Sequence, residues 1–151
     1  MDEKETKEKR DWLKHRLHQY QDILSELDQI AKSVQQLEAV MHSPRGSNLD
    51  GIPKSPGAGN PVLGMVTQHV TLLDRYREKM VGLESAAVDI ENLIDQLEPV
   101  TRRLMRHRYI EGLTWEEVCV AIGYSWRQTH NLHAKALDAI LEAEEGRKNE
   151  N

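Results

Sequence analysis

The chain has 151 residues, of which 30% are charged and 5% aromatic, with one Cys and no Phe. This length allows one ordinary domain or two small ones, and so few aromatic side chains favour long helices with aliphatic seams over a thick globular core. The single Cys excludes a disulfide framework within the chain. No apolar run approaches the ~18 residues of a membrane span, and the charged start lacks the apolar stretch of a signal peptide, so we expect a cytoplasmic protein with no membrane partner.

The net charge of −5 is unevenly distributed along the chain. Residues 99–135 hold six Lys and Arg against three Glu, a local charge of +3, whereas the rest of the chain carries −8. A basic segment inside an acidic chain indicates a nucleic-acid partner for that segment only.

The first predicted element is a helix over residues 11–42, with residues 1–10 expected to fray because they are all polar after Met1. The apolar residues of this helix recur every three or four positions, and no Pro or Gly lies between them. They are Leu13, Leu17, Tyr20, Leu24, Leu27, Ile30, Val34, Leu37 and Met41.

Residues 43–64 interrupt the helical pattern, since they contain four of the five Pro and five of the nine Gly. We interpret them as a flexible connector, with the alternative that Arg45 and Lys54 make the loop contact a phosphate or a partner.

Pro61, at a favoured first-turn position, opens a second long helix that ends near Glu98, because Pro99 disfavours helical angles in the residue before it. Its apolar positions follow a sustained heptad, in which His69 is the one strongly polar member. They are Val62, Val66, His69, Leu73, Tyr76, Met80, Leu83, Ala87, Ile90, Ile94 and Leu97. A further helix over residues 100–111 is expected to pack Leu104 inward.

Two long helices with one apolar stripe each predict an antiparallel, coiled-coil-like hairpin over residues 1–97. Apolar residues beside the seams would stay partly uncovered by such a hairpin, and this favours a homo-oligomer, most simply a dimer through the long helices. These flanking residues are Trp12, Ile23, Met65, Leu72 and Leu93.

Residues 98–141 have the layout of a helix-turn-helix domain, with 142–151 as a polar tail. Thr114 and Glu117 predict a capping box at the start of a helix over 115–122, and Gly123 suits a left-handed cap at its end. Ser125 is the N-cap of the next helix. That helix is expected to turn Thr129, Leu132, Ala136, Leu137 and Ile140 inward. We expect this domain to be separable, as a fragment that begins near Asp95.

This segment resembles region four of bacterial sigma factors. The matching residues are Leu97, Pro99, Arg108, Tyr109, Gly112, Leu113, Thr114, Glu116, Glu117, Val118, Ile122, Gly123, Ser125, Asn131, Leu132, Lys135, Ala136 and Leu137. Cys119 replaces the small Ala of the pattern and is expected to be a core residue. Because a helical part precedes the sigma-like segment, the chain resembles the phage late-transcription regulators of the RinA and ArpU type.

The resemblance implies a sequence-specific double-stranded DNA-binding regulator whose Ser125 helix enters the major groove. Base-facing residues would then be Trp126, Arg127, Gln128 and Asn131, and the DNA backbone would be held by Arg108, Thr114, His130 and Lys135. For Trp126 a contact with a partner protein remains equally open, and Trp115 is expected to be half-buried packing.

Two other functions remain open. A small terminase subunit of a phage packaging machine also combines a helix-turn-helix with helical oligomerisation, although its DNA-binding domain usually lies at the N-terminus. Alternatively, the sigma-like module binds RNA polymerase and never DNA. No cofactor or catalytic activity is expected, because no P-loop, HExxH or nucleophile elbow occurs. The pairs His15/His18 and His130/His133 lack the further ligands of a metal site.

Overall fold

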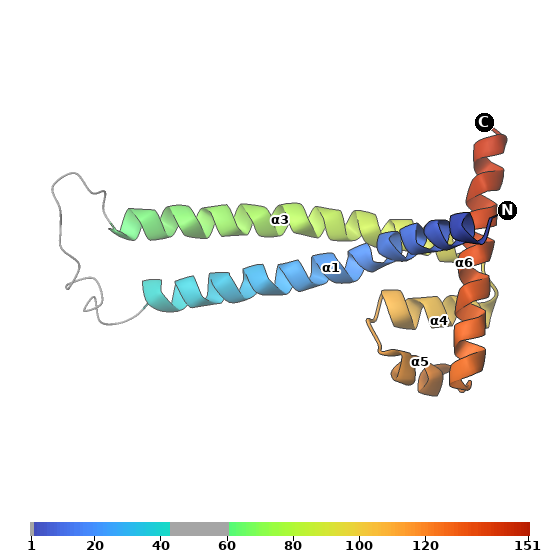
Figure 1. The fold of residues 1–151 in the computed structure, drawn as a ribbon. Helices are drawn as coiled ribbons and strands as arrows, with labels where there is room; N and C mark the ends of the chain where they lie inside the picture. Colours follow the sequence, from blue (N-terminus) through green and yellow to red (C-terminus); the bar gives the residue numbers. More distant parts are fainter. Residues whose placement is uncertain (1, 43–60) are drawn as a thin grey trace. The chain divides into compact units, whose positions relative to one another are not determined.

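The structure, a computed structural model, describes residues 2–42 and 61–151 and is all-α, as predicted. The described residues form five helices and no strand. The helices are α1 (Glu3–Met41), α3 (Pro61–Ile94), α4 (Pro99–Tyr109), α5 (Trp115–Ile122) and α6 (Trp126–Asn149) (Figure 1). Most of the predicted loop 43–64 lies outside the described residues, and its last four residues belong to α3.

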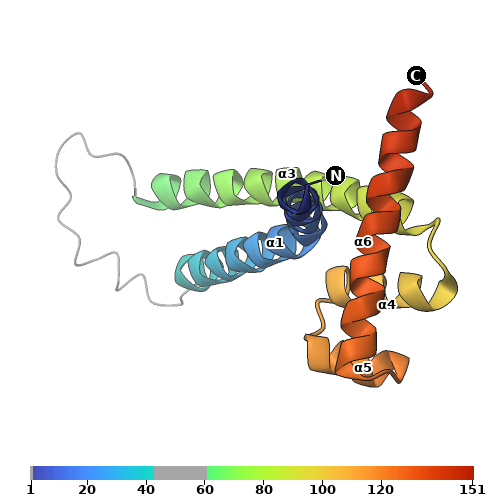
Figure 2. The same cartoon turned by 45° about the vertical axis from the view of Figure 1, so that its right-hand side comes forward.

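The chain divides into two compact units, each of which takes part of both long helices. Unit 1 consists of Met1–Asp22 and Leu83–Asn151, and unit 2 of Ile23–Gly82. The helices α4, α5 and α6 all belong to unit 1, where they pack against one another (Figures 1 and 2).

In unit 2 the two helical segments run antiparallel, as their cross-helix contacts show. Glu26 pairs with Lys79 at 2.5 Å, and further along Glu38 lies 3.0 Å from the Nε2 atom of His69. His69 therefore makes a polar contact beside the apolar seam. In the described part of this unit only Leu27 is buried, so the seam is mostly half-covered in a single chain.

Unit 1 holds the hydrophobic core, and both long helices contribute to it. Leu13 and Leu17 come from α1, and Ile90 and Ile94 come from α3; all four are at most 1% exposed. They pack with side chains of α4, α5 and α6, namely Leu104, Met105, Tyr109, Val118, Ala136, Leu137 and Ile140. The expectation of a separable fragment from Asp95 is therefore not supported, because that fragment would expose the faces that α1 and α3 cover.

The first turns of α1 are helical from Glu3, in contrast to the predicted fraying of residues 1–10. Lys9 pairs with Glu145 at 2.8 Å, and Arg10 makes two hydrogen bonds to the carboxylate of Asp138. These ion pairs join α1 to α6, which continues as a helix through residues 142–149 of the predicted polar tail. Hydrophobic periodicity does not reveal such long-range pairs, because both partners are polar.

Apart from the start of α1 and the end of α6, the predicted helix boundaries lie within four residues of the observed ones. The helix α3 ends at Ile94, four residues before the predicted end, and Leu97 in the connection is buried. Pro99 occupies the first turn of α4, as its fixed φ and missing N–H allow. Leu104 of α4 is fully buried, as predicted.

The shared core gives a testable consequence for Leu17. Leu17→Ala should lower the free energy of unfolding of unit 1 by about 2–5 kcal/mol, because it leaves a cavity among residues of α1, α3 and α4–α6. Urea denaturation followed by near-ultraviolet circular dichroism measures this loss. Val120→Ala, at a position that is 83% exposed, is the matched control and should change stability by less than about 0.5 kcal/mol. An equally small effect of both variants would contradict the shared core.

Candidate nucleic-acid interface

The turn between α5 and α6 is built by local hydrogen bonds that the sequence largely predicts. The Thr114 hydroxyl accepts from the Glu117 amide at 3.3 Å, as expected for an N-cap. The return bond differs, because the Glu117 carboxylate accepts from the Thr114 hydroxyl at 3.0 Å and not from its amide. Gly123 ends α5 with a φ of 74°, a left-handed conformation that costs a residue without Cβ little.

Ser125 caps α6 in a complete capping box. Its hydroxyl accepts from the Gln128 amide at 3.2 Å, and the Gln128 side-chain oxygen accepts from the Ser125 amide at 3.1 Å. The Gln128 side chain, predicted to face bases, therefore has its carbonyl engaged in the cap of its own helix. The box fixes the first turn of α6 and with it the direction of the side chains that follow.

The exposed face of α6 presents Arg127, Asn131 and Lys135, which lie at successive four-residue steps. All three side chains are exposed, and within the described part of the chain they make no hydrogen bond or ion pair. Beside them is a shallow hollow of about 320 Å³, lined by Tyr124, Gln128, Asn131, Leu132 and Lys135. Three polar side chains are thus held on one rigid helix face with their donors and acceptors free.

Trp126 and His130, at the edge of this face, are part of a cluster of tilted aromatic rings. The Trp126 and His130 rings are centred 4.4 Å apart, and His130 lies 4.5 Å from Trp115 of α5. The His130 Nε2 atom is buried and has no hydrogen-bond partner among the described residues. The structure therefore places His130, predicted to hold phosphate, between two indoles. Trp126 remains 52% exposed, and Trp115 is half-buried as expected.

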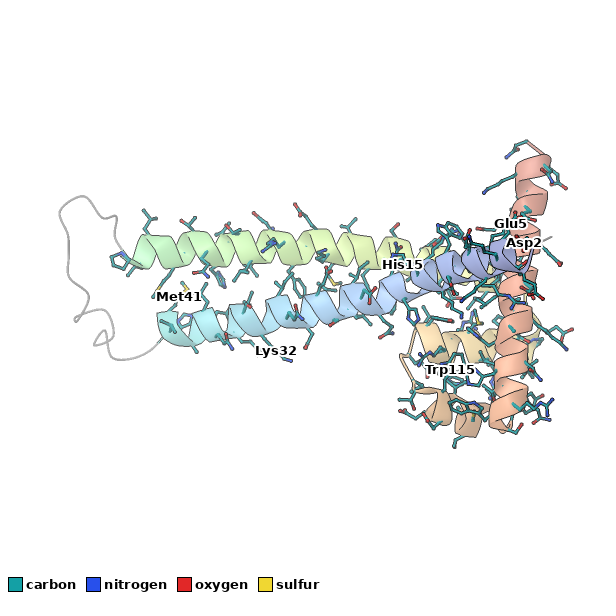
Figure 3. The ribbon with its side chains drawn as sticks, viewed as in Figure 1. Asp2, Glu5, His15, Lys32, Met41 and Trp115 are labelled. Carbon is teal, nitrogen blue, oxygen red and sulfur yellow. The ribbon has the colours of Figure 1, made fainter. Side chains whose placement is uncertain are left out.

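Arg108, which was predicted to hold the DNA backbone, also makes its contacts within the protein. Its guanidinium lies 4.7 Å from the ring centre of Trp115, in a cation–π arrangement, and donates to the Leu113 carbonyl at 2.9 Å. The Trp115 side chain thus sits between α4 and α6 (Figure 3). In this arrangement Arg108 joins α4 to α5, His130 joins α6 to α5, and Thr114 fixes the start of α5.

A buried hydrogen bond lies behind this cluster. The Tyr109 hydroxyl and the His133 Nε2 atom are 2.6 Å apart, and the two residues are 1% and 6% exposed. Burial raises the pKa of Tyr109 to about 12 and lowers that of His133 to about 3. At neutral pH the Tyr109 hydroxyl therefore keeps its proton and donates a hydrogen bond to the neutral His133 imidazole. His133 was not among the residues predicted to turn inward, although its spacing from Thr129 and Leu137 places it on the inner face of α6.

The charge of α6 changes along its length. Between Trp126 and Lys135 the helix has no acidic residue, whereas Asp138, Glu144 and Glu145 follow. Arg16 binds Glu144 at 2.9 Å, and Lys9 and Arg10 hold the other two carboxylates. Basic side chains of α1 thus balance three of the four carboxylates in the second half of α6, and Glu142 is the fourth.

Across residues 2–42 and 61–151, no three His, Cys, Asp or Glu side chains gather in a way that could hold a metal ion. Among the helices described, none is both long and apolar enough to cross a membrane. Comparisons of the chain with protein-family models, with curated proteins and with solved structures find no match.

The low pKa of His133 predicts loss of stability in mild acid. Between pH 6.5 and about 4.5 an unfolded chain protonates His133 and the folded chain does not, so the free energy of unfolding should fall with pH by up to about 1.4 kcal/mol per unit. His18 adds to the fall, because burial and the nearby Arg108 charge lower its pKa too. Below that range Glu91 and Glu145 add to the loss of stability, since hydrogen bonds to Arg106 and Lys9 lower the pKa of these two carboxyl groups in the folded chain.

Urea denaturation at several pH values should show this slope. His133→Gln keeps an acceptor for Tyr109 but does not titrate, so its slope should be shallower than that of the wild type. Val120→Ala, an exposed substitution that removes no titrating group, is the control and should leave the slope unchanged. Equal slopes for wild type and His133→Gln would mean that His133 does not resist protonation.

Proposed function

We propose that the chain is a sequence-specific double-stranded DNA-binding transcription regulator, of the kind that activates late genes in phages and prophages. In this proposal α5 and α6 form a helix-turn-helix, and the first half of α6 enters the major groove. The observation that supports it is the exposed row of Arg127, Asn131 and Lys135, whose hydrogen-bonding groups have no partner among the described residues. Their helix is capped by Ser125, and its opposite face is buried in the core. Such a regulator would act in the cytoplasm of the bacterial host.

The side chains of the row suit the two tasks of a DNA-binding helix. Arg and Asn make bidentate contacts to guanine and adenine edges in the major groove, so Arg127 and Asn131 are assigned to base recognition. Lys135 has only donors on a flexible stem and is assigned to phosphate. Trp126 is half-exposed beside the row, where its indole can contact a sugar or a thymine methyl.

The engaged residues have supporting roles in this proposal. Gln128 fixes the first turn of α6 through its cap, which engages its side-chain oxygen and leaves its amide nitrogen without a partner among the described residues. Arg108 and His130 set the position of α6 through Trp115, and Thr114 sets the start of α5. A second copy of the chain, joined through the long helices, and RNA polymerase are the protein partners that the proposal includes.

The test compares Asn131→Ala with Lys135→Ala. A duplex sequence is first selected from a random library with the purified full-length chain, and each variant is then titrated against this duplex and a scrambled one at one salt concentration. Asn131→Ala should weaken the selected site by about tenfold or more, because a base contact contributes ~1–3 kcal/mol, and leave scrambled DNA almost unchanged. Lys135→Ala should weaken both alike, and wild-type binding should fall with salt at a log–log slope of roughly −3 to −5.

Asn149→Ala, near the far end of the same helix, is the matched control and should bind both duplexes as the wild type does. Equal losses on the two duplexes for Asn131→Ala would remove its role in base recognition. Failure to select any duplex sequence would overturn the proposal. Retention of RNA polymerase by the same preparation would then favour the polymerase-binding alternative.

A further inference from the structure

The helix α3 carries a second apolar stripe that no described residue covers. Leu63, Val70, Val81 and Val88 are 63%, 50%, 68% and 60% exposed. They are spaced by seven, eleven and seven residues, and each of these steps returns to the same helix face within about 20°. The flanking residues that the sequence suggested for a dimer differ from these, and one of them, Leu93, is buried.

Two charged residues occupy the centre of this stripe. Asp74 and Arg77 lie on the same face between Val70 and Val81, with side chains that are 63% and 79% exposed. Among the described residues their only ion pair is with each other, within one helix, at 3.9 Å. A pair so exposed adds little to stability by itself.

The order of these residues is symmetric about the midpoint between Arg75 and Tyr76. Placed antiparallel to a second α3 about that midpoint, Leu63 faces Val88 of the other copy, and Val70 faces Val81. Asp74 then faces Arg77 twice, once on each side of the twofold axis. A twofold interface requires such self-complementarity, because each residue that contacts a second residue is contacted by it in return.

We infer that this face of α3 binds the same face of a second copy, with the two helices antiparallel. Steps of four, three and four residues separate Val70, Asp74, Arg77 and Val81, as in the seam of a coiled coil, and Leu63 and Val88 lie one heptad beyond each end. The stripe holds one acidic and one basic residue, so it offers a polyanion no net electrostatic attraction. The inference deepens the dimer of the proposed function, and it does not depend on DNA binding, since its tests contain no DNA.

The first test exchanges the central charges. Asp74→Arg alone and Arg77→Asp alone each place two like-charged pairs across the interface, so each variant should dimerise at least about tenfold more weakly than the wild type. Mixing the two variants opposes Arg to Asp at both sites and should restore the dimer, as should the double variant Asp74→Arg/Arg77→Asp. Sedimentation equilibrium measures all four, with circular dichroism to confirm that each remains helical.

Arg75→Asp is the matched control, because it changes the same charge on a different face of α3 and should leave the dimer unchanged. A monomeric wild type overturns the inference. A mixture that associates no more tightly than its two components also overturns it, because loss of the ion pair within the helix is not repaired by mixing.

The second test fixes the direction of the helices, in a Cys119→Ser background. Val70→Cys/Val81→Cys should form disulfide-linked dimers on mild oxidation, whereas Val70→Cys alone should not. In the antiparallel pair the two copies of position 70 are about 16 Å apart along the helix axis, too far for a disulfide. Ready cross-linking of Val70→Cys alone would show a parallel pair and overturn the inference.

Discussion

The structure of unit 1 depends on one constraint, which is that α4, α5 and α6 cannot bury their apolar faces among themselves. Three helices of 11, 8 and 24 residues leave Leu104, Tyr109 and Leu137 in need of a cover. Leu13 and Leu17 of α1, together with Ile90 and Ile94 of α3, supply it. The segment with the candidate interface and the ends of the long helices therefore form one hydrophobic core, and a change in either is expected to be felt by the other.

The elements were predictable because their signals are local. Thr114, Gly123 and Ser125 act within one turn of the chain, and caps and left-handed glycines can be recognised without knowledge of the fold. The extension of α1 to Glu3 was not predictable, because the partners of Lys9 and Arg10 lie more than 120 residues away. Only the fold brings these charges together, and polar residues carry no periodic signal of such pairing.

The candidate site divides in the same way. Arg127, Asn131 and Lys135 follow from the four-residue spacing of an exposed helix face, so the sequence suffices to group them. The roles of Arg108 and His130 depend on where the Trp115 ring lies, and the sequence shows only that Trp115 is near the start of a helix, not which side chains its ring contacts. His133 was missed because a histidine was read as polar, although burial beside Tyr109 keeps its imidazole neutral.

The charges along α6 limit how much of this helix attracts a polyanion. Beyond Arg127 and Lys135 come Asp138, whose charge Arg10 balances, and Glu142, for which the described residues provide no ion pair. A polyanion that follows the helix past Lys135 therefore gains no further attraction there. The attractive contact of the first turns is limited to roughly the first 15 Å of a helix about 36 Å long. The acidic stretch separates this contact from the basic last turn, where Arg147 and Lys148 lie.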